Sequence, residues 1–360
     1  MSEEKKKPVR VWVDGCFDMM HWGHANLCRQ ARLLGDFLVV GVHNDAEVRL
    51  NKGPPVMNEN ERYTAVEACK WVDQLVKDAP YYTSLEFCAK YDIDIIIHGD
   101  DVSVGADGTD TYAAAKAAGK FQTVPRTIGV SSTDLVGRML LLTKSHFVKD
   151  DDVKKDRKRA DSLTEASQSS TGAKTIVSQF LPLSRRIVQF SDQVEPKKSD
   201  TIVYVDGGFD MFHVGHIEFL KEAKKLGSYM IVGIHSDDMI NEIKGDNYPI
   251  MNVHERTLSV LSCRYVDEVI IGAPWAVSKQ MIEDLAITKV VHGSIYEEEA
   301  KEKYEKQDPY ADAKEAKVYQ EIQSPNGLTT TDLVGRIIAN RSAFLARNKK
   351  KQQHEAAINK

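Results

Sequence analysis

The sequence is poor in cysteine and has no long apolar run. Its 360 residues include five cysteines, an odd number without a C-x-x-C pair or a metal-ligand rhythm. This pattern predicts a reduced, intracellular protein rather than one held together by disulfides. No run approaches the roughly 18 apolar residues of a membrane span, and the first residues lack the apolar core of a secretory signal. We therefore expect no membrane span and a cytoplasmic location.

The sequence also lacks an excess of positive charge. Its 48 Lys and Arg residues face 53 Asp and Glu residues, which leaves a net charge of −5. A nucleic-acid-binding protein needs a basic surface to neutralise phosphates, so we expect no nucleic-acid partner. The 42% apolar and 28% charged residues are ordinary for a globular protein. At this length the chain can form two domains, each with a core of its own.

A long internal repeat is the main feature that is present. The stretch Val13–His24 returns as Val205–His216, and both read V-D-G-x-F-D-M-x-H-x-G-H. Further along, Thr133–Arg138 returns unchanged as Thr331–Arg336. A period of this length indicates two whole domains rather than an array of small repeats.

The repeat divides the chain into four parts. We predict one domain at residues 9–145 and a second at residues 201–345. The linker between them, residues 146–200, begins with a stretch rich in Asp, Lys, Ser and Thr that we expect to be disordered. Residues 346–360 form a polar tail. Two homologous domains in one chain can pair as an internal pseudo-dimer, which we expect here.

Short apolar runs alternate with helical patterns within each copy. The predicted strands of the first copy are Arg10–Asp14, Phe37–Val42 and Ile93–His98. The predicted helices are Gly23–Leu34 and Glu59–Val72, the second beginning with a capping box of Asn58 and Glu61. Alternating strands and helices predict an α/β fold, with a parallel sheet covered by helices on both faces.

The pair of His21 and His24 is the strongest chemical signal. It follows a strand and a glycine-containing turn, at the start of a helix, where free N–H groups and a partial positive charge favour phosphate. Two imidazoles at i and i+3 can both donate hydrogen bonds to phosphoryl oxygens. Two alternatives stay open: one histidine caps the helix while the other fills the core, or the pair binds a metal, although no Cys or carboxylate ligand set recurs with it.

Three motifs together resemble the cytidylyltransferase branch of the nucleotidyltransferase superfamily. They are D-G-C-F-D at Asp14–Asp18, H-W-G-H at His21–His24 and R-T-I-G-V-S-S-T at Arg126–Thr133. The resemblance spans both copies and implies two tandem Rossmann-like doubly wound domains. It also implies that the phosphate of an acceptor attacks the α-phosphorus of CTP, with Mg²⁺ neutralising the triphosphate. The tandem arrangement implies phosphoethanolamine as the acceptor, in phosphatidylethanolamine synthesis, with association at the endoplasmic reticulum left open.

The resemblance also implies which residues form the site. The catalytic residues are His21, His24, Lys52 and Arg126. The nucleotide-binding residues of the first copy are Gly15, Cys16, Phe17, Asp18, Gly23, Arg62, His98, Gly99, Asp101, Thr127, Ser131, Ser132 and Thr133. Those of the second copy are Gly208, Phe209, His213, Gly215, His216, Lys244, His292, Gly293, Leu328, Thr329, Thr330 and Thr331. No protein metal site and no tightly bound cofactor are expected.

Several of these residues have a plainer interpretation. Lys52 lies in a Gly-Pro-Pro loop that can close over nucleotide, but it can also be a solvated surface lysine. Arg62 follows the capping box, and a surface ion pair would look the same in the sequence. The segment at Arg126 can be a simple helix cap with a surface arginine, and the one at His98 can be a simple strand-terminating turn.

The two copies differ at one informative position. The first has Arg126 before its last shared motif, whereas the second has Ser324 there. We therefore expect the second copy to keep a nucleotide pocket but to contribute little turnover. Three other functions stay open: transfer to phosphocholine, adenylyl transfer, and regulation by nucleotide with one working half. The first is disfavoured because such enzymes typically carry one catalytic domain and a long amphipathic membrane-binding helix, for which the linker and tail are too polar.

Overall fold

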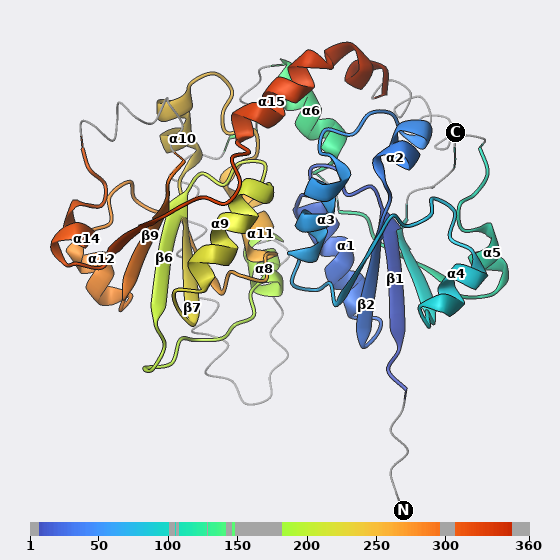
Figure 1. The fold of residues 1–360 in the computed structure, drawn as a ribbon, viewed down its shortest axis with the longest axis horizontal. Helices are drawn as coiled ribbons and strands as arrows, with labels where there is room; N and C mark the ends of the chain where they lie inside the picture. The colour runs from blue at the N-terminus through green and yellow to red at the C-terminus, as the bar shows by residue number, and fades with distance from the viewer. Residues whose placement is uncertain are drawn as a thin grey trace, which may run out of the picture. The chain divides into compact units, whose positions relative to one another are not determined.

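The chain is described by a computed structural model (Figure 1). It describes residues 7–100, 105, 108–127, 129–141, 146–147, 182–295 and 307–347. The candidate ligand Asp101, the first part of the predicted linker and the tail after residue 347 lie outside the described residues. The contacts divide the chain into a first unit, Met1–Leu140 with Thr329–Lys360, and a second unit, Leu141–Leu328.

The first unit contains one parallel five-stranded sheet, which confirms the predicted α/β fold. From edge to edge its strands are β3 (Gln74–Lys77), β2 (Phe37–Val42), β1 (Arg10–Gly15), β4 (Ile95–Gly99) and β5 (Phe121–Val124). Strand β1 pairs with β2 on one side and with β4 on the other, so the strand order reverses there. Ligands of open parallel sheets bind at such a switch point, outside the carboxyl ends of the strands.

Helices connect these strands, and two of them differ from the sequence prediction. The helices are α1 (Trp22–Arg32), α2 (Asp45–Asn51), α3 (Glu59–Glu67), α4 (Leu85–Lys90), α5 (Ala113–Ala117) and α6 (Ser132–Leu141). Helix α3 begins with the predicted capping box but ends at Glu67, because Ala68 closes it before the turn into β3. Helix α1 buries Trp22, Ala25, Cys28 and Ala31, whereas Leu34 is 40% exposed. Helix α1 thus begins one residue before the predicted helix Gly23–Leu34 and ends two residues before it does.

The second unit repeats the same sheet. Its strand order is β10 (Tyr319–Ile322), β9 (Lys289–Gly293), β6 (Ile202–Gly207), β7 (Tyr229–Ile234) and β8 (Glu268–Ile271). Its helices are α8 (Pro182–Phe190), α9 (Val214–Lys224), α10 (Asp237–Lys244), α11 (Val253–Leu261), α12 (Lys279–Asp284) and α14 (Ala311–Glu315). Phe190 of α8, near the end of the predicted linker, is 1% exposed.

The end of the chain packs with the first unit. Helix α15 (Thr330–Ala339) and the helical residues 341–347 belong to the compact unit formed by Met1–Leu140. The sequence repeat assigns α15 to the second copy, so compact unit and sequence copy do not coincide here. None of the helices in the described part of the chain has the length and apolar character needed to cross a membrane.

Candidate active site

The turn between β1 and α1 has the same unusual backbone in both units. Phe17 and Met19 have φ angles of 51° and 47°, and Phe209 and Met211 have φ angles of 49° and 52°. A left-handed backbone costs a residue with a side chain about 1–3 kcal/mol and persists where the surroundings enforce it. In the first unit this turn holds the Phe17 ring 5.5 Å from the ring of His24. The turn thus presents its residues at the switch point of the sheet.

The two histidines of the first unit lie face to face at the start of α1. Their ring centroids are 4.0 Å apart, with 22° between the planes. Gly23 donates its backbone N–H to Nδ1 of His21 over 3.1 Å, and His21 donates its N–H to Nδ1 of His24 over 3.4 Å. A neutral imidazole that accepts at Nδ1 carries its hydrogen on Nε2. Both rings therefore cap the helix and still offer an Nε2–H donor, so capping and phosphate binding are compatible.

Gly23 allows a second segment to cross the helix start. A Cβ atom at this position would lie 2.9 Å from both Nδ1 of His21 and Cγ1 of Val130. At Gly215, the equivalent position, it would lie 2.3 Å from the carbonyl oxygen of Leu328. Only glycine leaves this room, which lets Val130 pack against the start of α1 beside His21.

Hydrogen bonds attach this segment to its surroundings. The side-chain amide of Asn26 on α1 donates to Oγ1 of Thr127 over 2.9 Å. Ser131 caps α6, because its Oγ accepts from the N–H of Asp134 over 3.1 Å. Ser132 at the start of α6 donates its hydroxyl to the carbonyl oxygen of Asp18 over 2.8 Å. The start of α6 is therefore held against the β1–α1 turn, beside the histidines.

Lys52 lies where helix α2 ends and its side chain is exposed. Its Nζ is 5.9 Å from the ring centroid of Tyr81. Burial lowers the pKa of His43 at the end of β2, and the charge of Lys52 contributes to this shift. In the second unit, burial, His213 and Lys244 together hold the pKa of His216 well below its usual value. The positive charge of each loop lysine thus contributes to lowering the pKa of a nearby histidine.

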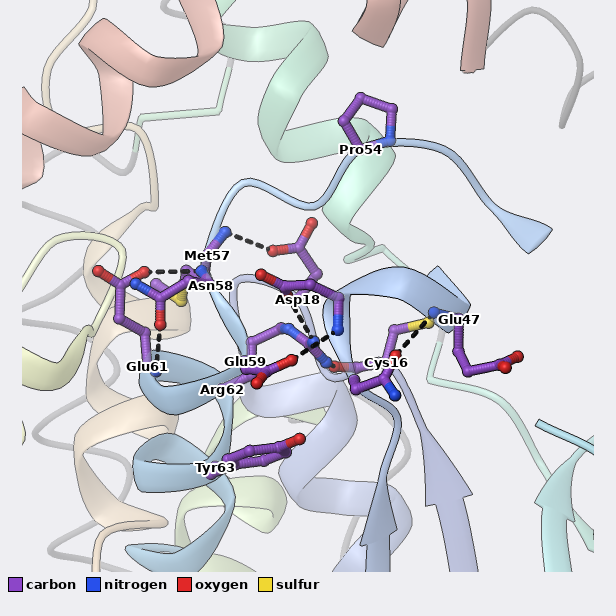
Figure 2. A network of polar contacts seen from close by, with 12 residues as sticks. Cys16, Asp18, Glu47, Pro54, Met57, Asn58, Glu59, Glu61, Arg62 and Tyr63 are labelled. Carbon is purple, nitrogen blue, oxygen red and sulfur yellow. Dashed lines mark hydrogen bonds and ion pairs between the residues drawn. The ribbon is translucent and has the colours of Figure 1, made fainter. Parts of the chain in front are cut away.

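Two predicted nucleotide ligands instead hold the protein together. The carboxylate of Asp18 is buried and accepts the N–H groups of Val56 and Met57 over 3.0 and 2.9 Å (Figure 2). Arg62 is 0% exposed, and it donates to the carbonyl oxygen of Cys16 over 2.7 Å and to Asp45 over 2.9 Å. Neither a surface ion pair nor a direct nucleotide contact fits a fully buried guanidinium. Arg62 therefore holds the turn that carries Cys16, a role that the sequence prediction missed.

The second unit keeps this framework. Asp210 accepts the N–H of Ile250 over 2.7 Å and that of Met251 over 2.9 Å. Arg256 donates to the carbonyl oxygen of Gly208 over 2.6 Å and to Asp237 over 2.7 Å. Other predicted residues of this unit lie at equivalent places: Phe209 and His213 beside His216, and Lys244 at the end of α10. Thr329, Thr330 and Thr331, at the start of α15, belong to the first compact unit.

The carboxyl end of β4 forms the other side of the switch point. Nδ1 of His98 lies 3.0 Å from the carbonyl oxygen of Gly99, and its ring is 5.0 Å from that of Tyr112. His292 lies likewise 2.7 Å from the oxygen of Gly293 in the second unit. Strand β4 pairs with β1. The structure therefore places the H-G motif beside the carboxyl end of β1, where the strand order of the sheet reverses.

A buried aspartate next to the site escaped the sequence analysis. Asp14 is 4% exposed and accepts hydrogen bonds from Nε1 of Trp12, from the hydroxyl of Thr83 and from that of Tyr112. The repeated V-D-G was a signal for this position, but its partners are far away in the sequence. Among the residues that the structure describes, no group of three or more His, Cys, Asp or Glu side chains is arranged to hold a metal ion.

In the second unit the same aspartate has a different environment. Asp206 accepts from the hydroxyl of Tyr310 over 2.7 Å, but Val277 replaces the threonine that bonds the first aspartate. Burial raises the pKa of Asp206 to about 6, and the hydrogen bond from Tyr310 opposes this shift. The two carboxylates thus differ in their donors, because Val277 stands in place of Thr83 and Tyr204 in place of Trp12.

Comparison with known proteins agrees with this geometry. Residues 12–138 and 204–336 match the cytidylyltransferase-like family. The chain is 53% identical over 351 residues to the ethanolamine-phosphate cytidylyltransferase of Dictyostelium discoideum, which covers 97% of this chain and 96% of that protein. It is 50% identical over 359 residues to the Arabidopsis thaliana protein of the same name, covering 98% of this chain and 85% of that protein.

A choline-phosphate enzyme matches a much shorter part. Choline-phosphate cytidylyltransferase A of Homo sapiens is 42% identical over 137 residues, which are 38% of this chain and 37% of that protein. The relatives that align along almost the whole chain share its two copies of the motif-bearing domain. The chain therefore belongs to the cytidylyltransferase-like family, in the group of the ethanolamine-phosphate cytidylyltransferases.

Proposed function

We propose that the first unit transfers a cytidylyl group from CTP to phosphoethanolamine, giving CDP-ethanolamine and pyrophosphate. The observation that carries this proposal is the stacked pair of His21 and His24, each accepting a backbone N–H at Nδ1. Their Nε2–H groups, at a helix N-terminus beside the segment of Arg126, suit the phosphates of a nucleotide.

The reaction needs little acid–base chemistry from the protein. An oxygen of the phosphoethanolamine phosphate, already anionic, attacks the α-phosphorus of CTP. A new P–O bond forms, the bond from the α-phosphorus to the bridging oxygen breaks, and pyrophosphate leaves with the electron pair. Catalysis then depends on holding the two phosphates in line and on stabilising the charge that develops between them.

Four residues supply these functions in our proposal. His21 and His24 donate hydrogen bonds to the reacting phosphates, while Lys52 and Arg126 bring positive charge to the triphosphate. Mg²⁺ enters as part of the CTP substrate and neutralises the β- and γ-phosphates. The second unit binds cytidine nucleotide in this proposal and contributes little turnover itself. The proposal includes a cytoplasmic location, based on the cysteine pattern of the sequence.

A substrate panel tests the proposal directly. The purified protein is incubated with CTP, Mg²⁺ and one phosphorylated amino-alcohol at a time, and pyrophosphate and the CDP-alcohol are measured. We expect CDP-ethanolamine to form with the highest kcat/KM, and phosphocholine to react poorly. A preference for phosphocholine, or for ATP in place of CTP, would assign the chain another substrate. Release of pyrophosphate without CDP-ethanolamine would overturn the proposal.

A further inference from the structure

Residues outside the loop that carries Lys52 hydrogen-bond to it. Residues 52–57 include Pro54 and Pro55, which have no N–H group to donate. The N–H groups of Val56 and Met57, which follow, both donate to the carboxylate of Asp18. The loop therefore relies on other parts of the first unit to bond its carbonyl groups.

One such carbonyl is bonded by the last described residue of the chain. Nη1 of Arg347 donates to the carbonyl oxygen of Pro54 over 3.0 Å and lies 3.5 Å from Oδ2 of Asp18. The Arg347 side chain is 15% exposed, and its Cδ would lie 3.5 Å from a Cβ atom at Gly53. The arginine thus packs along the loop at the residue next to Lys52, and it bonds the same aspartate that holds the far end.

A second arginine secures that far end. Arg336 on α15 donates to both carboxylate oxygens of Glu61, over 2.7 and 2.9 Å, and to the carbonyl oxygen of Val56 over 3.3 Å. Glu61 also accepts the N–H of Asn58, which begins α3 (Figure 2). The hydrogen bonds that Arg336 donates to Glu61 raise the pKa of Arg336, as a close opposite charge must. A two-bond contact of this kind fixes orientation as well as distance.

The equivalent loop of the second unit is held differently. Asn241 on α10 donates its side-chain amide to the carbonyl oxygens of Gly245, Asp246 and Tyr248, over 3.0, 3.1 and 2.7 Å. The residue at this position in the first copy is Arg49, which has no amide to offer. Asn241 thus bonds carbonyl groups of the second loop from its own helix, and Nε2 of His146 lies 2.7 Å from the carbonyl oxygen of Pro249. In the first loop, α2 bonds the N–H groups of Lys52 and Gly53, and the carbonyl oxygen of Pro54 is bonded by Arg347.

We propose that Arg347 is a positioning residue for Lys52, with Arg336 holding the other end of the same loop. Arg347 touches no reacting atom; it keeps the loop where the lysine meets the triphosphate. This inference rests on the proposed function, in which Lys52 contacts CTP. Without Arg347, the carbonyl of Pro54 loses its donor and Asp18 loses a neutralising charge next to the loop. The end of the chain is thereby a working part of the N-terminal site.

The kinetic test compares three variants of the full chain. We expect Arg347→Ala to raise the KM for CTP by about tenfold and to leave the KM for phosphoethanolamine within about twofold. Because a single nitrogen of Arg347 makes both polar contacts, Arg347→Lys should restore most of the affinity for CTP. Arg341→Ala, an exposed arginine on the same segment, is the matched control and should behave as the wild type.

A double-mutant cycle separates positioning from general support. If Arg347 acts through Lys52, adding Arg347→Ala to Lys52→Ala should change kcat/KM by less than about twofold. A full additional loss in that background, or an unchanged KM for CTP in Arg347→Ala alone, would overturn the proposal.

Hydrogen exchange gives a readout that does not depend on the reaction. Without nucleotide, the amides of Lys52 and Gly53 should exchange at least about tenfold faster in Arg347→Ala than in the wild type or in Arg341→Ala. Equal protection in all three proteins would show that Arg347 does not hold the loop. Faster exchange in a protein that makes no CDP-ethanolamine would refute the proposed function and leave the anchoring of the loop intact.

Discussion

The two units share a sheet, a strained turn and a histidine pair, but they differ in charge where phosphate would bind. In the first unit the N–H of Arg126 donates to Asp100 over 2.9 Å, whereas in the second the N–H of Ser324 donates to Ser294 over 3.1 Å. Serines thus stand in the second unit where the first has the arginine and the aspartate. A fold can thus keep the shape of a nucleotide pocket while it loses the charges that stabilise a transition state.

The histidine pairs offer the largest expected contrast. In the first unit, His24→Ala removes a donor to the reacting phosphates and should lower kcat by at least about a hundredfold. The matched change His216→Ala should leave a substantial fraction of the activity. Steady-state kinetics on both full-length variants measures this contrast, with circular dichroism as the control for folding. Equal losses would show that both units turn over, and a reversed pattern would place catalysis in the second.

Replacement of Arg126, where the second unit has Ser324, should have the next largest effect on activity. Arg126→Ser makes the first segment like the second and should reduce kcat/KM for CTP by about 10- to 100-fold, the scale of one hydrogen bond to a charged group. The reciprocal Ser324→Arg should not raise total activity by more than about twofold, because the carboxylate partner is also absent. Activity unchanged in Arg126→Ser would mean that this arginine is a simple surface residue.

Replacements of the two loop lysines, Lys52 and Lys244, should differ less strongly in their effect on catalysis. Lys52→Ala should raise the KM for CTP and lower kcat/KM by about tenfold in total. Because Lys52 is exposed, the free energy of unfolding should change by no more than about 0.5 kcal/mol. Lys244→Ala is the matched control and should leave turnover nearly intact. A large loss of stability with normal kinetics would instead give Lys52 a structural role.

The buried aspartates provide the smallest and most local test. The pKa of Asp206 is about 6 in the folded protein and 3.8 in its ordinary state, so between these values the folded form holds a proton that the unfolded form lacks. The second unit must then lose stability as pH rises from about 4 to 6. Val277→Thr supplies the hydroxyl donor found in the first unit, lowers this pKa and should recover about 1 kcal/mol above pH 6.

Urea unfolding at about pH 4.5 and pH 7 measures this effect. Val277→Ala is the control, because it removes packing without adding a donor and should destabilise equally at both pH values. The reverse change in the first unit, Thr83→Val, removes the hydroxyl donor to Asp14 and should lower the stability of that unit. A pH dependence that Val277→Thr leaves unaltered would mean that the missing donor is not what separates the two carboxylates.

Local patterns in the sequence predicted much of the fold correctly. The strand at Phe37–Val42 and the capping box at Asn58 were recognisable because they depend on neighbours a few residues away. The same holds for the histidine pair, whose capping of α1 uses only the i and i+3 positions.

Contacts between distant residues needed the tertiary structure. Nothing in the sequence places Asp18 on the backbone of Met57, or Arg62 fully inside rather than on the nucleotide. Side-chain type allows a charged residue to bind a ligand or to hold a loop, and only packing decides between the two.

The sequence alone determined that the chain contains two related α/β domains, that each carries a histidine pair at a helix start, and that one of them lacks an arginine. These are repeats and local motifs, and their physics acts over a turn or two of chain. Only the tertiary structure decided that Arg347 bonds the Lys52 loop, across a sequence separation of 293 residues. It likewise showed that Asp14 and Asp206 have different donors, because Val277 and Tyr204 replace Thr83 and Trp12. Such contacts depend on which surfaces meet after folding, and no local pattern of residues carries that information.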